Sequence, residues 1–515
     1  MKDWFLIASL FIGGNAAAGE LSPDTADLLD PYQLARAISL DVRGVVPEAS
    51  EVEQIAASGS FEDAMLDAWL ESEEFEAQVI EHHRSLFWNK ASFTILKNRN
   101  LSRQNGVYFG RFLSTARRGR GKTGCTDYPA DVNELNQPQS WIERSGTSNG
   151  IEYNWKDEGM VEVQPWWDME TTVKVCAYDA QLTSVSSTGT DCSMNGANDD
   201  PECGCGENLK WCSTGGIQAS LLEDMSTALT ERVRILLQAD RPYSDLLTSS
   251  TVLLNGRIAE YYRNRSSFSS TVTSPLDVDQ IPDIPVDAYD TWVEVEGDEA
   301  HAGVLTEPGW MLRHQTNRGR ANRFYGAFLC KEFIPPPDGI AETNEEDPTP
   351  DLSRRPGCKD CHALLEPWSS GWGRWKEVGS RHFSADDYPD FSQECYDCAI
   401  NGGCSSYCRN NYLVRATHPD QEPFLGWYLP YIYLKQEEAE HPTAGPKLWA
   451  QESIDDGYFA RCASQNAARW LLGWSDDEMQ ADQVDAWTAD FIASGLSYRA
   501  LIRSIITSPV YGRSK

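Results

Sequence analysis

Positive charge is scarce in this sequence. Of the 515 residues, 44 are Lys or Arg and 78 are Asp or Glu, so the formal net charge is -34. A surface this acidic repels phosphate backbones and anionic lipid headgroups, so we expect no nucleic-acid binding and no binding to membrane surfaces. The partner that such a surface favours is a protein with a basic patch.

Long apolar runs are also missing. No stretch reaches the about 18 consecutive apolar residues that a transmembrane helix requires, so we expect no membrane span. Residues 1–18 instead have the pattern of a signal peptide: Lys2, an apolar stretch from Trp4 to Gly14, and small residues at Ala16–Ala18. We therefore predict an exported protein, periplasmic or extracellular, that is soluble once residues 1–18 are removed.

Cysteine is absent from the first part of the chain and frequent afterwards. The first is Cys125, so no lipid anchor is indicated near the cleavage site. The full count is fourteen, which in an exported chain indicates an oxidising compartment and disulfides. If Cys358 and Cys361 are set aside for the motif described next, the other twelve permit up to six bridges, whose pairing the sequence does not specify.

One short motif carries specific chemistry. In "RRPGCKDCHALLEPW", residues 354–368, Cys358 and Cys361 are separated by two residues and His362 follows at once. A c-type heme needs two thiols for its two vinyl groups and a histidine for its iron, and this spacing supplies all three on one helical turn. The motif occurs once. We therefore predict one covalent heme c, with His362 as the proximal iron ligand.

A zinc site and a redox dithiol are two other interpretations of the motif. A zinc site would need two further ligands, for which Cys395 and Cys398 are candidates, but those cysteines have nearer partners in sequence. A redox dithiol is typical of a thioredoxin-like βαβ pattern, which the surrounding sequence lacks. Heme attachment is favoured over both.

The second axial ligand of the iron is not fixed by the sequence. His301, Met311 and His314 rank first because all three fall in one short segment upstream of the motif. An open site without a protein ligand is also compatible with the sequence. Further candidates lie downstream, at His382, His418, His441 and Met479.

Two polar segments resemble other metal sites. "CYDCAINGGCSSYC", residues 395–408, could hold zinc or an iron–sulfur cluster, but two disulfides are favoured in an oxidising compartment. "GTDCSMNGANDDPE", residues 189–202, gives only weak support to a calcium site, because it lacks the glycine and glutamate register of a calcium loop. Its candidate ligands are Asp191, Asn195, Asn198, Asp199 and Asp200.

The predicted fold class is mainly α, with helical domains around a c-type heme module and two irregular, disulfide-rich insertions. We expect a helix beginning at Asp30-Pro31, one long helix from Ser60, further helices across 217–262 and a short strand at Thr291–Glu296. The predicted segments are an N-terminal helical domain (25–120), a Cys-rich insertion (121–215), a helical segment and linker (216–300), a heme-binding region (301–389), a Cys-rich loop (390–412) and a C-terminal helical domain (413–515).

Several stretches together resemble planctomycete-type cytochrome c proteins. "YQLARAISLDVRGVVPEASEV" is similar to their N-terminal helical domain, "GAFLCKEFIPPP" followed by "CKDCHALLEPW" to their heme-bearing region, and "FARCASQNAARWLLGW" to their C-terminal helical domain. The resemblance covers about half the chain and excludes both Cys-rich insertions. It implies an exported heme protein in electron transfer, with Cys358, Cys361 and His362 holding the heme and Cys330 and Cys462 as structural cysteines.

Three functions are compatible with these observations. The first is an exported monoheme cytochrome that transfers electrons to and from a redox partner. The second is a heme oxidoreductase with an open distal position that acts on a small molecule or peroxide, which the length of the chain favours because a simple carrier needs only about 100 residues. The third is a surface or scaffold protein whose disulfide-rich insertions bind a partner and whose heme is secondary. The sequence names no catalytic residue.

Overall fold

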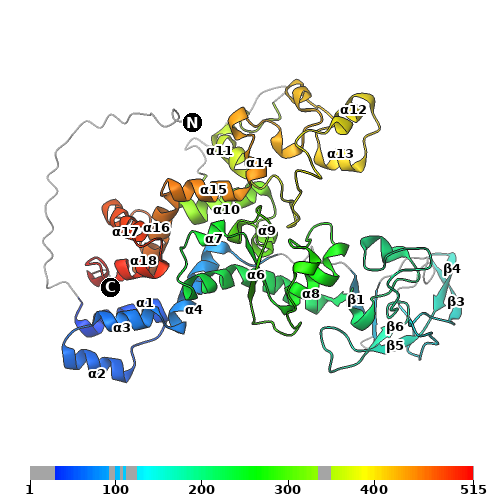
Figure 1. The fold of residues 1–515 in the computed structure, drawn as a ribbon, viewed down its shortest axis with the longest axis horizontal. Helices are drawn as coiled ribbons and strands as arrows, with labels where there is room; N and C mark the ends of the chain where they lie inside the picture. The colour runs from blue at the N-terminus through cyan, green and yellow to red at the C-terminus, as the bar shows by residue number, and fades with distance from the viewer. Residues whose placement is uncertain (1–28, 92–98, 105–107, 112–123, 334–348, 514–515) are drawn as a thin grey trace.

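The computed structural model describes residues 29–91, 99–104, 108–111, 124–333 and 349–513. Helices make up most of the regular structure, as expected, and most of the strands gather in one lateral module (Figure 1). The expected signal peptide, residues 1–18, lies outside these described ranges. Within them, no helix combines the length and the apolar character needed to cross a membrane.

The N-terminal segment forms four helices: α1 (Pro31–Arg43), α2 (Ala49–Ser58), α3 (Asp63–Leu70) and α4 (Glu73–Phe87). Asp30 caps α1 and Pro31 takes its first position, as the sequence predicts. The single long helix predicted from Ser60 is wrong. Ser72 divides it, because its hydroxyl accepts the backbone N–H of Phe75 at 3.2 Å and so starts α4 as a separate helix.

The main core joins both ends of the chain. Besides α1, α3 and α4, eight later helices contribute to it. They are α6 (Gly215–Gln238), α7 (Asp245–Thr248), α9 (Pro308–Arg313), α10 (Asn317–Leu329), α15 (Pro446–Asp455), α16 (Tyr458–Leu472), α17 (Ala481–Ala493) and α18 (Tyr498–Ile506). The apolar faces of α17 and α18 are buried in this core. The two terminal helical segments, expected as separate domains, therefore share one core.

The lateral module contains strands where helices or irregular chain were expected. The prediction of helix up to residue 120 is wrong for β1 (Asn100–Gln104) and β2 (Tyr108–Gly110). The insertion 121–215, predicted to be irregular, contains five more strands: β3 (Ile142–Ser148), β4 (Ile151–Asp157), β5 (Met160–Val163), β6 (Val173–Cys176) and β7 (Ser213–Thr214).

Five of these strands form one sheet in the order β5-β6-β2-β1-β7, and β3 and β4 form a separate hairpin. Three disulfides stabilise the module: Cys125–Cys176, Cys192–Cys203 and Cys205–Cys212. The chain passes directly from β7 into α6, so the last strand ties the module to the helical body.

The stretch between α6 and the heme-binding region is only partly helical. After α7, residues predicted as helix form the strand β8 (Thr251–Leu254), and α8 (Gly256–Asn264) follows. β8 pairs antiparallel with β9 (Val293–Glu296), which confirms the short strand expected at Thr291–Glu296. The prediction of helix failed at β8 because this pairing joins segments about 40 residues apart, which local periodicity does not record.

The second Cys-rich segment is a small separate unit. It contains α12 (Gln393–Asn401) and α13 (Ser406–Asn411), and the chain continues to α14 (His441–Ala444). Two disulfides, Cys395–Cys408 and Cys398–Cys404, hold it together, as predicted for this stretch. The sixth bridge, Cys330–Cys462, links the end of α10 to α16. All twelve cysteines outside the motif are therefore paired.

Candidate functional site

The cysteine–histidine motif begins the helix α11 (Lys359–Ser370). Cys358 is the N-cap residue, and Cys361 and His362 lie in the first turn. The backbone N–H of His362 donates to the carbonyl oxygen of Cys358 at 3.0 Å. The three side chains are half-buried and come from one turn, which is the arrangement that the spacing predicts.

The rest of α11 is fixed by aromatic packing. Trp368 contacts Phe324 of α10, with ring centroids 5.5 Å apart, and stacks on Trp449 of α15 at 4.7 Å. The indole N–H of Trp449 also donates to the carbonyl oxygen of Trp368 at 3.1 Å. Among the apolar residues after the motif, Leu365 and Trp368 pack on the main core, whereas Leu364 is 51 % exposed.

A charged network holds the imidazole of His362. Its Nδ1 lies 2.5 Å from Oε1 of Glu366, one turn further along α11. The guanidinium of Arg318, on α10, donates to the same carboxylate through Nε at 2.7 Å and Nη2 at 3.2 Å. Since Glu366 occupies Nδ1, Nε2 is the ring nitrogen that remains for an iron.

The two thiols of the motif are free. Cys358 and Cys361 are unbridged, whereas the other twelve cysteines all form disulfides. Each thiol can therefore form a thioether bond to a vinyl group, and Nε2 of His362 on the same turn can reach the iron of the same porphyrin. This donor set fits a c-type heme.

The geometry does not suit zinc. Tetrahedral zinc with bonds of about 2 Å draws its ligand atoms to within about 4 Å of one another. In the described part of the chain, the one group of three or more Cys, His, Asp or Glu side chains gathered this closely is Cys125, Glu158 and Cys176. Two of these are bonded to each other as a disulfide, and the group does not include the motif.

The surroundings of α11 are helical. Its main neighbour is α10, and it also contacts α14. A thioredoxin-like dithiol would place its first cysteine between a central strand and a helix. The helical packing of α11 differs from that context, although Cys358 does occupy a helix N-cap.

The three leading distal candidates lie in different surroundings. His301 is buried with its ring 5.5 Å from that of Trp375, and burial lowers its pKa to about 4. Met311 is fully buried in the main core. His314 places Nε2 3.1 Å from the carbonyl oxygen of Phe87, and burial likewise lowers its pKa to about 4. The ring contacts and hydrogen bonds described for His301 and His314 do not involve the motif, and the distal ligand is not assigned.

The downstream candidates lie in several surroundings, and His382 shares the ring of Trp375 with His301. His382 packs against Trp375 at 4.8 Å, and Met479 lies at the edge of the main core. His418 accepts the backbone N–H of Asp420 at 3.1 Å through Nδ1. His441 is nearest to α11, because its ring lies 4.3 Å from that of Trp449, which stacks on Trp368.

A cavity of 1240 Å³ borders one flank of α11. Glu366 lines it and also binds His362, so this carboxylate lies between the motif and the cavity. Several residues within 420–438, which follow the second Cys-rich segment in sequence, also line it. Its lining is mixed in charge and includes Arg318, Asp351, Lys376, Glu377, Lys435 and Glu438.

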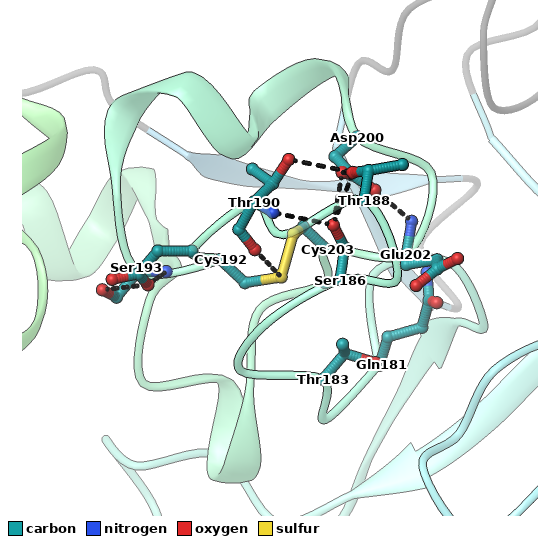
Figure 2. The surroundings of a disulfide bond; sticks show 12 residues. Gln181, Thr183, Ser186, Thr188, Thr190, Cys192, Ser193, Asp200, Glu202 and Cys203 are labelled. Atoms are coloured by element: carbon teal, nitrogen blue, oxygen red, sulfur yellow. Dashed lines mark hydrogen bonds between the residues drawn. A yellow bond between two sulfur atoms is a disulfide. The ribbon is translucent and has the colours of Figure 1, made fainter.

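In the segment that gives weak support to a calcium site, candidate ligands accept hydrogen bonds from the protein itself. Asp200 accepts hydrogen bonds from the hydroxyls of Ser186, at 2.8 Å, and Thr188, at 3.0 Å, beside the Cys192–Cys203 disulfide (Figure 2). Burial raises the pKa of Asp200, but hydrogen bonds from these hydroxyls and from the backbone N–H of Glu202 lower it to about 2.

Two of the other candidate calcium ligands also accept hydrogen bonds from protein side chains. Asp191 accepts from Ser193 at 2.7 Å, and Asn198 accepts from Arg99 at 3.1 Å. Asn195 and Asp199 lie in the short helical turn Asn195–Asp199. Three of the five candidate ligands, Asp191, Asn198 and Asp200, therefore accept hydrogen bonds from other protein groups.

The chain was compared with protein-family models, with curated proteins and with solved structures. None of them matches. The site is therefore interpreted from its own residues. Two of these residues are not among the predicted site residues. The i,i+4 spacing of Glu366 from His362 is a usable sequence signal, whereas Arg318 has no local signal.

Proposed function

We propose that this protein is an exported monoheme c-type cytochrome that transfers electrons. Cys358 and Cys361 would hold the heme by thioether bonds, and His362 would ligate its iron. One observation carries the proposal: of fourteen cysteines, only the two of this motif are unpaired, and they share one helical turn with the histidine. The resemblance to planctomycete-type cytochrome c proteins supports the same assignment.

The bound heme would supply one reversible electron, cycling its iron between the ferric and ferrous states. The chain's contribution is attachment and orientation. α11 presents both thiols and the imidazole from one rigid turn, and the stacking of Trp368 on Trp449 fixes that helix to the main core. Glu366 fixes the orientation of the imidazole ring.

Charge and cysteine chemistry suggest the setting. A net charge of -34 favours a redox partner that presents a basic patch, and association should weaken as salt is added. Six disulfides are typical of an oxidising compartment, which supports export to the periplasm or beyond the cell.

A second candidate is a heme oxidoreductase with an open distal position. The cavity of 1240 Å³ beside α11 favours it, because pockets for small molecules typically measure about 300–1,000 Å³ and this one is at least as large. The cavity shares Glu366 with the proposed iron ligand, so a small molecule could occupy space next to the heme site.

The visible spectrum of the protein, produced in a host that matures c-type cytochromes, tests both candidates. A sharp reduced α-band of the c type would support the heme assignment, and its loss in Cys358→Ala/Cys361→Ala would assign it to this motif. If carbon monoxide leaves the reduced spectrum unchanged, the iron has two protein ligands and electron transfer is supported. A shift with carbon monoxide would favour the oxidoreductase. Absence of heme in the competent host would refute both.

A further inference from the structure

We propose that Glu366 is a positioning residue that sets the reduction potential of the heme through His362. The inference rests on the proposed function, since it concerns the iron ligand of that heme. In this account the carboxylate of Glu366 makes the imidazole of His362 a stronger electron donor, which stabilises ferric iron and lowers the potential. Nothing in the heme motif itself specifies this property.

The hydrogen bond between His362 and Glu366 lies at the ring nitrogen opposite the one available to iron. Oε1 of Glu366 lies 2.5 Å from Nδ1 of His362, on the ring nitrogen that faces away from an iron bound at Nε2. A metal-bound histidine commonly donates its other N–H to a carboxylate or to a backbone carbonyl, and this partner fixes the tautomer and raises the basicity of the ligand. A carboxylate has this effect more strongly than a neutral carbonyl because it carries a full negative charge.

The carboxylate of Glu366 is itself held in place by a second helix. Arg318 of α10 donates hydrogen bonds to both carboxylate oxygens of Glu366, from Nε at 2.7 Å and from Nη2 at 3.2 Å. α10 is the main packing partner of α11. This bidentate geometry defines the plane of the carboxylate as well as its place. His362 and Glu366 are also only about one quarter exposed, at 24 % and 26 %, so solvent weakens their interaction less than at an open surface.

A purely structural role is the alternative. Pairs spaced i,i+4 on a helix often stabilise the helix and nothing else. The two roles differ in what they change. A helix-stabilising pair would leave the iron's electronic properties unaffected, whereas a ligand-tuning pair changes the potential while the heme stays attached.

The experiment compares Glu366→Gln and Glu366→Ala with wild type in a host that attaches heme. Glutamine keeps a neutral acceptor of similar shape, and alanine removes the acceptor. The control is Asp360→Asn, which removes the same charge from an exposed position on the same helix. The readouts are the midpoint potential from a redox titration and the EPR spectrum of the ferric protein, which reports the ligand field at iron.

We expect both Glu366 variants to retain heme and to have a higher potential than wild type. The expected size is about tenfold in the reduction equilibrium constant, equal to about 59 mV for one electron. Their EPR spectra should change, and Asp360→Asn should show a smaller shift in potential with an unchanged EPR spectrum.

Equal shifts in Glu366→Gln and Asp360→Asn would mean that charge alone acts through space, and would overturn the proposal. Unchanged or lower potentials in both Glu366 variants would also overturn it, while the heme assignment would stand. A wild-type protein without heme would instead refute the proposed function. The two failures are therefore distinguishable.

Discussion

Cys330 at the end of α10 is bonded to Cys462 in the middle of α16, across 132 residues of sequence. The loop that this bond closes contains α11, the second Cys-rich segment and α14. One disulfide thus ties the helix that carries the motif, through its neighbour α10, to the C-terminal helices of the main core. This relationship and the contacts around it lead to specific predictions.

Removal of this disulfide should destabilise the whole helical body. We expect Cys330→Ala/Cys462→Ala to lower the free energy of unfolding by about 2–4 kcal/mol, because a long loop gains much entropy in the unfolded chain once it is opened. Denaturant unfolding followed by circular dichroism measures this. The matched control is Cys398→Ala/Cys404→Ala, which opens a loop of sequence separation 6 in the peripheral unit and should cost less. Equal midpoints for wild type and the first variant would contradict the prediction.

Arg320 should be essential for the packing between α9, α10 and the chain after α11. Its side chain is fully buried, and burial lowers the pKa of its guanidinium to about 9. The guanidinium donates hydrogen bonds to four backbone carbonyl oxygens, those of His314, Met311, Lys376 and Gly379. Arg320→Met leaves these acceptors unsatisfied, so we expect a loss of about 3 kcal/mol or more in the free energy of unfolding.

The control for this variant is Arg318→Met, which lies on the same helix with its side chain 51 % exposed. Loss of an exposed ion pair should cost about 1 kcal/mol or less. Chemical denaturation of both variants gives the comparison, and an Arg320→Met protein as stable as Arg318→Met would show that the buried guanidinium is dispensable.

Acid should destabilise the main core through His83. The ring is fully buried, with Nδ1 2.7 Å from the carbonyl oxygen of Val79 and Nε2 2.8 Å from the hydroxyl of Tyr243, and burial lowers its pKa from 6.5 to about 4. Between these values the unfolded chain binds a proton that the folded chain does not. Stability therefore falls as the pH drops from 6.5 towards 4, by about 3 kcal/mol from this residue.

His83→Gln removes the titrating group and keeps a donor and an acceptor. The free energy of unfolding, measured near neutral pH and again near the folded pKa, should drop less in this variant than in wild type, by about 3 kcal/mol. Parallel losses in the two proteins would assign the acid sensitivity to other groups and would contradict the account.

The sequence predicts local structure well where the cause is local. Three features follow from residues that are neighbours in the chain. They are the cap at Asp30, the apolar faces of α17 and α18, and the pairing of all four cysteines within residues 395–408. The hairpin of β3 and β4 had a local signal too, since Asn149 and Gly150 form its two-residue turn with positive φ, but the high density of turn residues around it favoured an irregular chain.

Other features depend on contacts between distant segments. β8 is a strand because it pairs with β9, and Arg318 reaches Glu366 because α10 packs on α11. Chain periodicity carries no information about such pairings, because they are set by the packing of whole elements.

The most direct test of the central claim is the intact mass of the exported protein, measured after denaturation and reduction. In a host that matures c-type cytochromes, we predict a mass that exceeds the processed polypeptide by one heme, and no such excess in Cys358→Ala/Cys361→Ala. A mass equal to that of the bare polypeptide, with Cys358 and Cys361 both open to alkylation, would contradict the claim and leave the motif as a dithiol or metal site.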